Sequence, residues 1–215
     1  MEKIVYDLKN DSYFLNARKD IIDQVSLTNV NNVLDIGCGS GATLAYIKSK
    51  KNHIKTIGVE PFCDDIHSHV DQIYKCNVQS FLAENEGCNF DLILCLDVLE
   101  HIWLYEDVLL ALTQKISESG KLIISVPNIA NFRALIHIFI LNNFPKDKEG
   151  IFDETHCRWF TCKVLKENLE RLGFSNIELR YSGMEKGKVL YYVNKITFGI
   201  FQRYLGFQII AIAKK

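Results

Sequence analysis

The chain has 215 residues, of which 48% are hydrophobic and 24% are charged, a composition typical of one globular domain with a substantial core. Its formal net charge of −1 creates no positive field over the whole surface, so the composition does not favour nucleic-acid binding. No apolar run approaches the roughly 20 residues that cross a bilayer, and the amino terminus shows no secretion signal, so we expect a soluble protein without a membrane span.

Short β-rich runs alternate with helical stretches along the chain, which is the pattern of a parallel α/β sheet. The expected strands are residues 32–36, 54–60, 72–76, 90–96, 121–126, 176–181 and 207–213. The expected helices are residues 42–47, 107–116, 129–141 and 163–172. Within one domain of residues 1–215, we expect residues 1–30 to form a helical lid and residues 128–162 an insertion over the active site.

The most informative motif follows the first expected strand, where Gly37, Cys38, Gly39, Ser40 and Gly41 lead into a helix. Glycine is needed where the backbone takes a positive φ or approaches a ligand closely. Such a turn is expected to leave backbone N–H groups and a helix N-terminus facing a ligand. The glycine spacing alone also fits a dinucleotide-binding fingerprint, so it leaves the ligand open.

Two acidic residues bear on the choice of ligand. Asp35 lies two residues before the first glycine, where its carboxylate would attract a cationic ligand and repel a pyrophosphate. S-adenosylmethionine carries both a sulfonium and an ammonium group. Glu60, at the end of the second expected strand, can accept both ribose hydroxyls, but dehydrogenases place an acid there too.

Across about residues 13–182 the chain resembles the class I S-adenosylmethionine-dependent methyltransferases. The matching segments, in order, are residues 33–41, Gly58-Val59-Glu60, residues 91–96 followed by Asp97-Val98-Leu99-Glu100-His101, and Ser125-Val126-Pro127-Asn128. The resemblance implies an α/β Rossmann-like three-layer sandwich, with a seven-stranded, mostly parallel sheet whose last strand is antiparallel. Residues 150–161 are similar to methyltransferases encoded with bacterial surface-polysaccharide and other small-molecule pathways, and to the methyltransferase-like protein of methionine biosynthesis.

The same resemblance implies S-adenosyl-L-methionine as the cofactor. The residues it assigns to the cofactor site are Arg18, Asp35, Gly37, Cys38, Gly39, Gly41, Glu60, Pro61, Asn77, Val78, Leu96 and Asp97. Asp35 would lie near the amino group, Glu60 would hold the ribose, and Arg18 would pair with the cofactor's carboxylate. Asn77 would lie by the adenine, although the family often has an acid at this position.

Two histidines are candidates for a catalytic role. His156 lies in a loop near the carboxyl edge of the expected sheet, and its near-neutral pKa suits proton abstraction from a hydroxyl or amine. His101 follows the fourth expected strand and has helix packing as its alternative role. Asp97 and Glu100 also have an alternative, because a carboxylate in the first turn of a helix stabilises the helix dipole.

Tyr13, Asn128 and Arg158 are the candidates for substrate binding. Arg158 would bind an anionic group of the substrate or, alternatively, pair with Asp153 or Glu154. The seven cysteines form no paired array for zinc, so we expect no metal, and we expect reduced thiols in a cytoplasmic protein.

The expected reaction is an in-line displacement at the sulfonium methyl group, in which the protein mainly aligns the reactants and excludes water. No Asn- or Asp-Pro-Pro-Tyr segment follows the fourth strand, and no basic, aromatic-rich appendage suggests RNA. We therefore expect a small-molecule acceptor, such as a sugar or a nucleotide- or lipid-linked precursor, and a monomer or homodimer without a nucleic-acid partner. The alternatives are an NAD-dependent oxidoreductase and a non-catalytic cofactor-binding partner protein.

Overall fold

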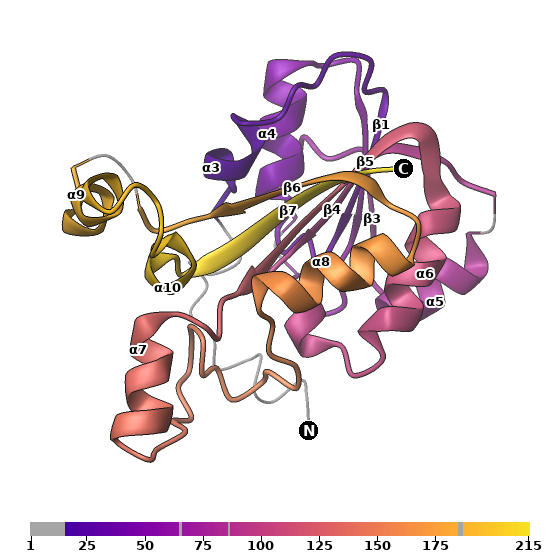
Figure 1. The fold of residues 1–215 in the computed structure, drawn as a ribbon. Coiled ribbons are helices and arrows are strands. Elements are labelled where there is room, and N and C mark those ends of the chain that lie inside the picture. Colours follow the sequence, from indigo (N-terminus) through magenta and orange to yellow (C-terminus); the bar gives the residue numbers. More distant parts are fainter. Residues whose placement is uncertain (1–15, 65, 86, 185–186) are drawn as a thin grey trace.

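The computed structural model describes residues 16–64, 66–85, 87–184 and 187–215, and Figure 1 shows a single sheet with helices on both faces. The strands are β1 (Asn32–Ile36), β2 (Lys55–Val59), β3 (Gln72–Tyr74), β4 (Phe90–Leu96), β5 (Ile116–Pro127), β6 (Ser175–Tyr181) and β7 (Gln208–Lys214). The α-helices are α3 (Lys19–Ile22), α4 (Ala42–Lys50), α5 (Val78–Glu84), α6 (Tyr105–Lys115), α7 (Phe132–Leu135), α8 (Cys162–Arg171), α9 (Val189–Ile196) and α10 (Gln202–Leu205). A 3₁₀ turn, η1 (Leu99–His101), follows β4, and a π-helical turn, η2 (Ile136–Ile140), continues α7.

The seven strands lie in the order β3-β2-β1-β4-β5-β7-β6. All neighbouring pairs are parallel except those made by β7, which runs antiparallel to both β5 and β6. The predicted Rossmann-like fold with an antiparallel last strand is therefore confirmed. Because β7 runs in the opposite direction, its first residue, Gln208, pairs with Pro127 at the carboxyl edge of the parallel strands.

Two buried clusters, one on each face of the sheet, form the core. On one face, α5, α6 and α8 contribute buried side chains such as Phe81, Leu109 and Leu165. On the other face, α3 and α4 contribute Ile21 and Leu44, among others. The strand between the two clusters, β4, is apolar at nearly every position, as expected for a strand that is covered on both sides. This packing holds the carboxyl ends of β1, β2 and β4 in fixed positions.

Several predicted elements differ from those in the structure. The helix expected over residues 129–141 begins only at Phe132, because Asn131 caps it by accepting a hydrogen bond from the backbone N–H of Arg133. Helix α6 begins at Tyr105, two residues before its expected start, and β5 begins at Ile116, which pairs with Phe90, and not at the expected residue 121. Helices α5, α9 and α10 were not predicted.

The two segments expected to cover the active site are partly visible. Of the predicted lid over residues 1–30, residues 1–15 lie outside the described part of the chain, and α3 with the residues around it is described. The insertion over residues 128–162 contains α7, η2 and a long loop. That loop is fastened to η1 because the backbone N–H groups of Cys157 and Arg158 both donate to the carbonyl of Glu100. Among the described residues, no helix has the length and apolar character to traverse a bilayer.

Candidate functional site

A cavity of about 1210 Å³ opens at the carboxyl ends of β1, β2 and β4. Ligands bind at this edge in parallel α/β sheets, because the loops that follow the strands diverge there. The predicted cofactor residues on the cavity wall are Arg18, Asp35, Gly37, Cys38, Gly39, Glu60, Pro61, Asn77, Val78, Leu96 and Asp97. Gly41 is the exception. It caps α4 in a left-handed conformation, and a Cβ there would lie 2.7 Å from Val70.

Position 37 in the glycine turn requires a residue without a side chain, both for packing and for backbone conformation. Gly37 has φ +69°, and a Cβ at this position would lie 2.5 Å from a methyl group of Val98. The backbone N–H groups of Gly37 and Cys38 donate to the carbonyl of Val59, and that of Gly39 donates to Glu60. The expectation that these groups face a ligand is therefore corrected: in this structure the protein itself supplies their acceptors. Burial raises the pKa of the Cys38 thiol far above its usual range, so Cys38 is a neutral packing group.

Two buried carboxyl groups form the acidic side of the cavity. Asp35 and Glu60 are 3% and 4% exposed. Burial, together with the charge of Glu60, raises the pKa of Asp35 to about 8, although Arg18 acts in the opposite direction. The two oxygens of Glu60 accept hydrogen bonds from the backbone N–H groups of Gly39 and Phe62, at 2.9 and 2.8 Å. A ligand with cationic groups would relieve the repulsion between these carboxyls, whereas a pyrophosphate would add to it.

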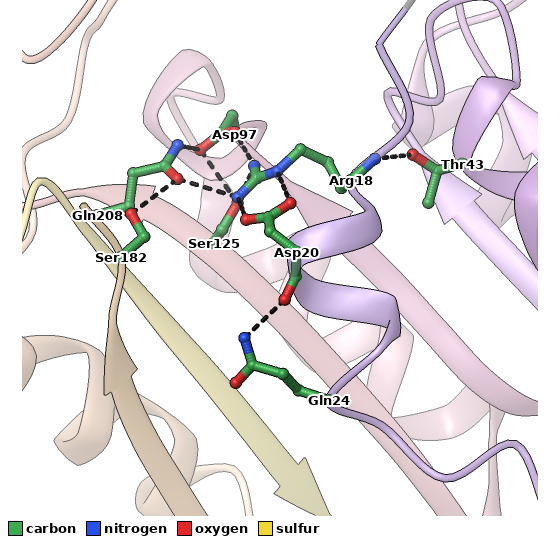
Figure 2. Close-up of polar contacts among 8 residues, drawn as sticks. All are labelled: Arg18, Asp20, Gln24, Thr43, Asp97, Ser125, Ser182 and Gln208. Atoms are coloured by element: carbon green, nitrogen blue, oxygen red, sulfur yellow. Dashed lines mark hydrogen bonds and ion pairs between the residues drawn. The ribbon is translucent and has the colours of Figure 1, made fainter. Parts of the chain in front are cut away.

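Arg18 joins the amino-terminal segment to the opposite wall of the cavity (Figure 2). Its guanidinium donates to Asp97 at 2.5 Å, to Ser125 at 3.2 Å and to Gln208 at 2.9 Å. On its other side, Arg18 forms a two-bond ion pair with Asp20. Arg18 thus forms ion pairs with two protein carboxylates, and its pairing with the cofactor's carboxylate stays a prediction.

Asp97 is held in a backbone conformation that is rare for a residue with a side chain, φ +58°. Its carboxylate accepts hydrogen bonds from Ser125 at 3.0 Å and from Gln208 at 2.7 Å, in addition to that from Arg18. Ser182 donates to the amide oxygen of Gln208 at 3.3 Å and extends the network to the end of β6 (Figure 2). A strained acid held by so many partners is typical of a functional site, and Asp97 lies directly on the cavity wall.

His101 and His156 pack edge to face, with their ring centres 4.7 Å apart. The Nδ1 atom of His156 lies 3.2 Å from the carbonyl oxygen of Ile151, which only accepts hydrogen bonds, so the ring proton is on Nδ1. The same holds for His101, because its Nδ1 faces the carbonyl oxygen of Thr155 at 3.3 Å and the Thr155 hydroxyl at 3.0 Å. In both rings Nδ1 therefore acts as the donor to the backbone of the loop. His101 lies on the cavity wall, whereas His156 lies behind it.

With Glu100, these histidines form a set of side chains that can hold a metal ion. One ligand atom from each of the three lies within 4.8 Å of the others, and Glu100 is only 1% exposed. Two neutral imidazoles and one carboxylate suit several divalent cations. Backbone carbonyls contact the Nδ1 atoms of both rings, and metal-binding histidines are usually oriented by a hydrogen bond of this kind. The sequence predicted no metal because this set forms only when the loop that carries His156 folds onto η1.

Neither of the two predicted substrate residues within the described part of the chain lies on the cavity wall. Asn128 is 1% exposed, and its amide donates to the carbonyls of Arg203 and Gly206, so its polar group serves the fold. The guanidinium of Arg158 stacks 4.1 Å over the Trp103 ring and donates to the Trp103 carbonyl at 2.7 Å. Arg158 thus supports a residue of the cavity wall without lining it. Tyr13 lies outside the described residues.

The sequence analysis did not predict several residues of the cavity wall. Gln208 and Ser182 come from β7 and from the residue after β6, and Trp103 and Leu104 follow η1. A signal for Gln208 was available, because the first residue of an antiparallel last strand must lie at the carboxyl edge of its parallel neighbours. Trp103 and Leu104 are both largely exposed and form an apolar part of the wall.

Comparison with known proteins identifies the class of this chain. A family profile described as "Methyltransferase domain" matches residues 12–179. The chain belongs to this family, and the enzyme class and cofactor predicted from the sequence, a class I S-adenosylmethionine-dependent methyltransferase, are confirmed.

Curated relatives carry more specific names. The chain is 30% identical over 143 residues to the ubiquinone biosynthesis O-methyltransferase of Coxiella burnetii, a match covering 60% of this chain and 59% of the relative. It is 26% identical over 100 residues to the mitochondrial ubiquinone biosynthesis O-methyltransferase of Schizosaccharomyces pombe, covering 43% and 36%. The matches thus span less than two thirds of either relative.

Solved structures agree on the fold. A S-adenosylmethionine-dependent methyltransferase from Archaeoglobus fulgidus superposes with a TM-score of 0.65 at 21% identity, covering 95% of this chain and 97% of the other. The plantazolicin methyltransferase BpumL, solved in complex with a pentazolic desmethylPZN analogue and SAH, gives a TM-score of 0.62 at 14% identity, covering 100% of this chain and 89% of the other.

Proposed function

We propose that this protein transfers the methyl group of S-adenosylmethionine to a hydroxyl oxygen of a small, largely apolar acceptor. The observation that carries the proposal is the division of one cavity into two parts. Asp35, Glu60 and the glycine turn form a side that suits the cationic cofactor. His101 and the apolar wall residues Trp103 and Leu104 form a side that suits the acceptor.

The relatives named O-methyltransferases support oxygen as the acceptor atom. An alcohol or phenol must lose its proton as it attacks, and the His101 imidazole, which lies on the cavity wall, would take that proton where no cation is bound. The sugar or polysaccharide acceptor expected from the sequence has no support in these comparisons. The apolar wall favours an acceptor with an aromatic or aliphatic body.

Glu100, His101 and His156 fit a divalent cation, and we include one in the proposal. When bound there, such a cation would lower the pKa of an acceptor hydroxyl that reaches it. The protein's part is to hold two imidazoles by their Nδ1 protons and to keep the Glu100 carboxylate buried beside them. Leu96 and Asp97, at the end of β4, would contact the methionine part of the cofactor.

Two measurements, made one after the other, test the proposed function. Calorimetric titration should show binding of S-adenosylmethionine and of its demethylated product, with no binding of NAD. Binding of NAD alone would instead favour the oxidoreductase alternative.

Methyl transfer is then assayed with a panel of catechols, simple phenols, amines and sugars. We expect product with the phenolic compounds, and cofactor binding without transfer to any member would support the non-catalytic alternative. The cytoplasmic location and the oligomeric state remain predictions.

A further inference from the structure

The elements beside the cavity expose an unusual number of large apolar side chains. α9, α10, α7 and η2 all lie at the end of the sheet where β6 finishes and β7 begins (Figure 1). We call their exposed apolar residues the apolar rim: Ile136, Phe139, Ile140, Leu141, Val189, Tyr192, Val193, Ile196, Phe198, Ile200 and Phe201. Phe198 is 92% exposed and Phe139 is 75% exposed. No residue of α9 or η2 is buried, so these elements add nothing to the core.

Buried hydrogen bonds tie the two halves of the apolar rim together. The side-chain amides of Asn128 and Asn131, which precede α7, both donate to the carbonyl of Gly206, which follows α10. Asn131 is fully buried and Asn128 nearly so. The rim therefore has a defined shape although its apolar side chains face solvent.

The charged residues within the two segments that carry the rim have one sign. Residues 187–206 contain Lys188, Lys195 and Arg203, and residues 128–144 contain Arg133, while neither segment contains an aspartate or glutamate. The surface of α8 differs, since its lysines alternate with glutamates and form ion pairs one turn apart. An ordinary solvated surface mixes both signs, as α8 does. The rim combines exposed apolar groups with positive charge alone.

We propose that the apolar rim docks on an anionic phospholipid bilayer, lying in the interface without crossing it. Short elements with exposed apolar and aromatic side chains bordered by Lys and Arg bind such surfaces, because apolar burial and attraction to acidic headgroups act together. A second copy of this chain is a poorer occupant. A two-fold contact through the rim would bring the like charges of both copies face to face.

Docking in this way would place the cavity next to the lipid. Ser182 and Gly183, where the chain leaves β6 toward α9, line the cavity wall. An acceptor dissolved in the bilayer would therefore have a short path to the cavity. The docking itself does not depend on which acceptor is methylated, so it is tested without an activity measurement.

The test is co-sedimentation of the full chain with vesicles of phosphatidylcholine, with or without phosphatidylglycerol. We expect binding to the phosphatidylglycerol vesicles, weakened by added salt. The triple variant Lys188→Gln, Lys195→Gln, Arg203→Gln should bind on the order of 100-fold more weakly. The triple variant Val189→Ser, Ile196→Ser, Phe198→Ser should lose binding by a similar or larger factor.

The matched control is Lys163→Gln, Lys166→Gln on α8 with Leu110→Ser on α6, which changes two lysines and an exposed apolar residue outside the rim. It should sediment like the parent chain. Circular dichroism and S-adenosylmethionine binding show that each variant is folded. The proposal is overturned if the parent chain ignores phosphatidylglycerol, or if the control loses as much binding as the rim variants. It is equally overturned if the serine variant only converts a dimer into a monomer.

Discussion

Arg18 and Asp97 form an ion pair at 2.5 Å, although 79 positions separate them in the chain. Arg18 precedes α3 in the amino-terminal segment, whereas Asp97 follows β4 in the middle of the sheet. Their side chains are only 20% and 23% exposed, so water screens the pair weakly. This contact joins two residues of the cavity wall, and it makes the amino-terminal segment a part of the site.

The first prediction is that Arg18→Gln weakens the link between the amino-terminal segment and the end of β4. We expect the free energy of unfolding to fall by about 1–3 kcal/mol, because Asp97 loses a charged hydrogen-bond donor in a partly buried place. The affinity for S-adenosylmethionine should fall roughly tenfold, since one wall of the cavity is no longer held. Denaturant unfolding and calorimetric titration measure the two effects.

The control for this prediction is Arg171→Gln. Arg171 also forms an ion pair, with Glu106 at 2.6 Å, but both side chains are more than half exposed. Such a pair contributes little, so stability and cofactor affinity should stay close to those of the parent protein. The double variant Arg18→Gln, Asp97→Asn should lose less stability than the sum of its single changes, and strict additivity would refute the coupling.

The strands that carry the site were predictable because of their composition. β1 and β4 are apolar runs bounded by polar or turn residues, and both were located to the residue. α9 was missed although its residues divide into an apolar and a polar face, and α10 was missed because it has only four residues. The positions of such helices depend on the surfaces that they contact, and the local sequence pattern does not show those surfaces.

The polar contacts of the site were less predictable than its strands. The glycine turn and Asp35 are nearly consecutive, and one motif reveals them. Gln208 joins Asp97 only through the antiparallel register of β7, and His156 reaches His101 only because residues 157–158 bond to the backbone of Glu100. Such contacts depend on tertiary geometry, which a single sequence does not encode locally.

The second prediction concerns Asp35, whose pKa burial raises to about 8. The unfolded chain gives up this proton near pH 3.8, whereas the folded chain holds it to about pH 8. The folded protein therefore loses stability as the pH rises between these two values. Asp35→Asn should therefore stabilise the ligand-free protein at pH 7, by on the order of 3 kcal/mol. Thermal unfolding at several pH values would show the gain disappear near pH 4.

The same substitution should weaken cofactor binding, because a neutral amide gives no attraction to the ammonium group. In the parent protein the dissociation constant for S-adenosylmethionine should fall between pH 6 and pH 8, by up to about tenfold per unit, as Asp35 loses its proton. In Asp35→Asn this dependence should vanish. The exposed Asp64→Asn serves as control and should keep the slope. A parent protein with no slope would argue against a role for Asp35 in charge recognition.

The third prediction is that methyl transfer depends on a divalent cation. Dialysis against EDTA should lower kcat by about 100-fold or more while cofactor affinity stays unchanged, and added Mg²⁺, Mn²⁺ or Zn²⁺ should restore it. His156→Phe should have the same effect without rescue, although His156 is not on the cavity wall. His53→Phe, an exposed histidine elsewhere, is the control. Full activity after chelation, with activity still lost in His101→Phe, would assign His101 as a base acting without metal.

The fourth prediction separates the two reasons for glycine at position 37. Gly37→Ala must adopt φ +69° and place a Cβ 2.5 Å from Val98, whereas Gly150→Ala must adopt φ +88° with nothing within 4 Å. Gly150→Ala should cost about 1–2 kcal/mol, the conformational part alone, and Gly37→Ala should cost more.

Adding Val98→Ala to Gly37→Ala should recover part of the lost stability, because it removes the methyl group that the new Cβ would meet. It should not restore the parent value, since the backbone strain remains and a small cavity is left behind. Urea unfolding of the four proteins decides the matter. Equal costs for the two alanine variants, with no recovery in the double variant, would show that conformation alone requires Gly37 and that the contact with Val98 is loose enough to yield.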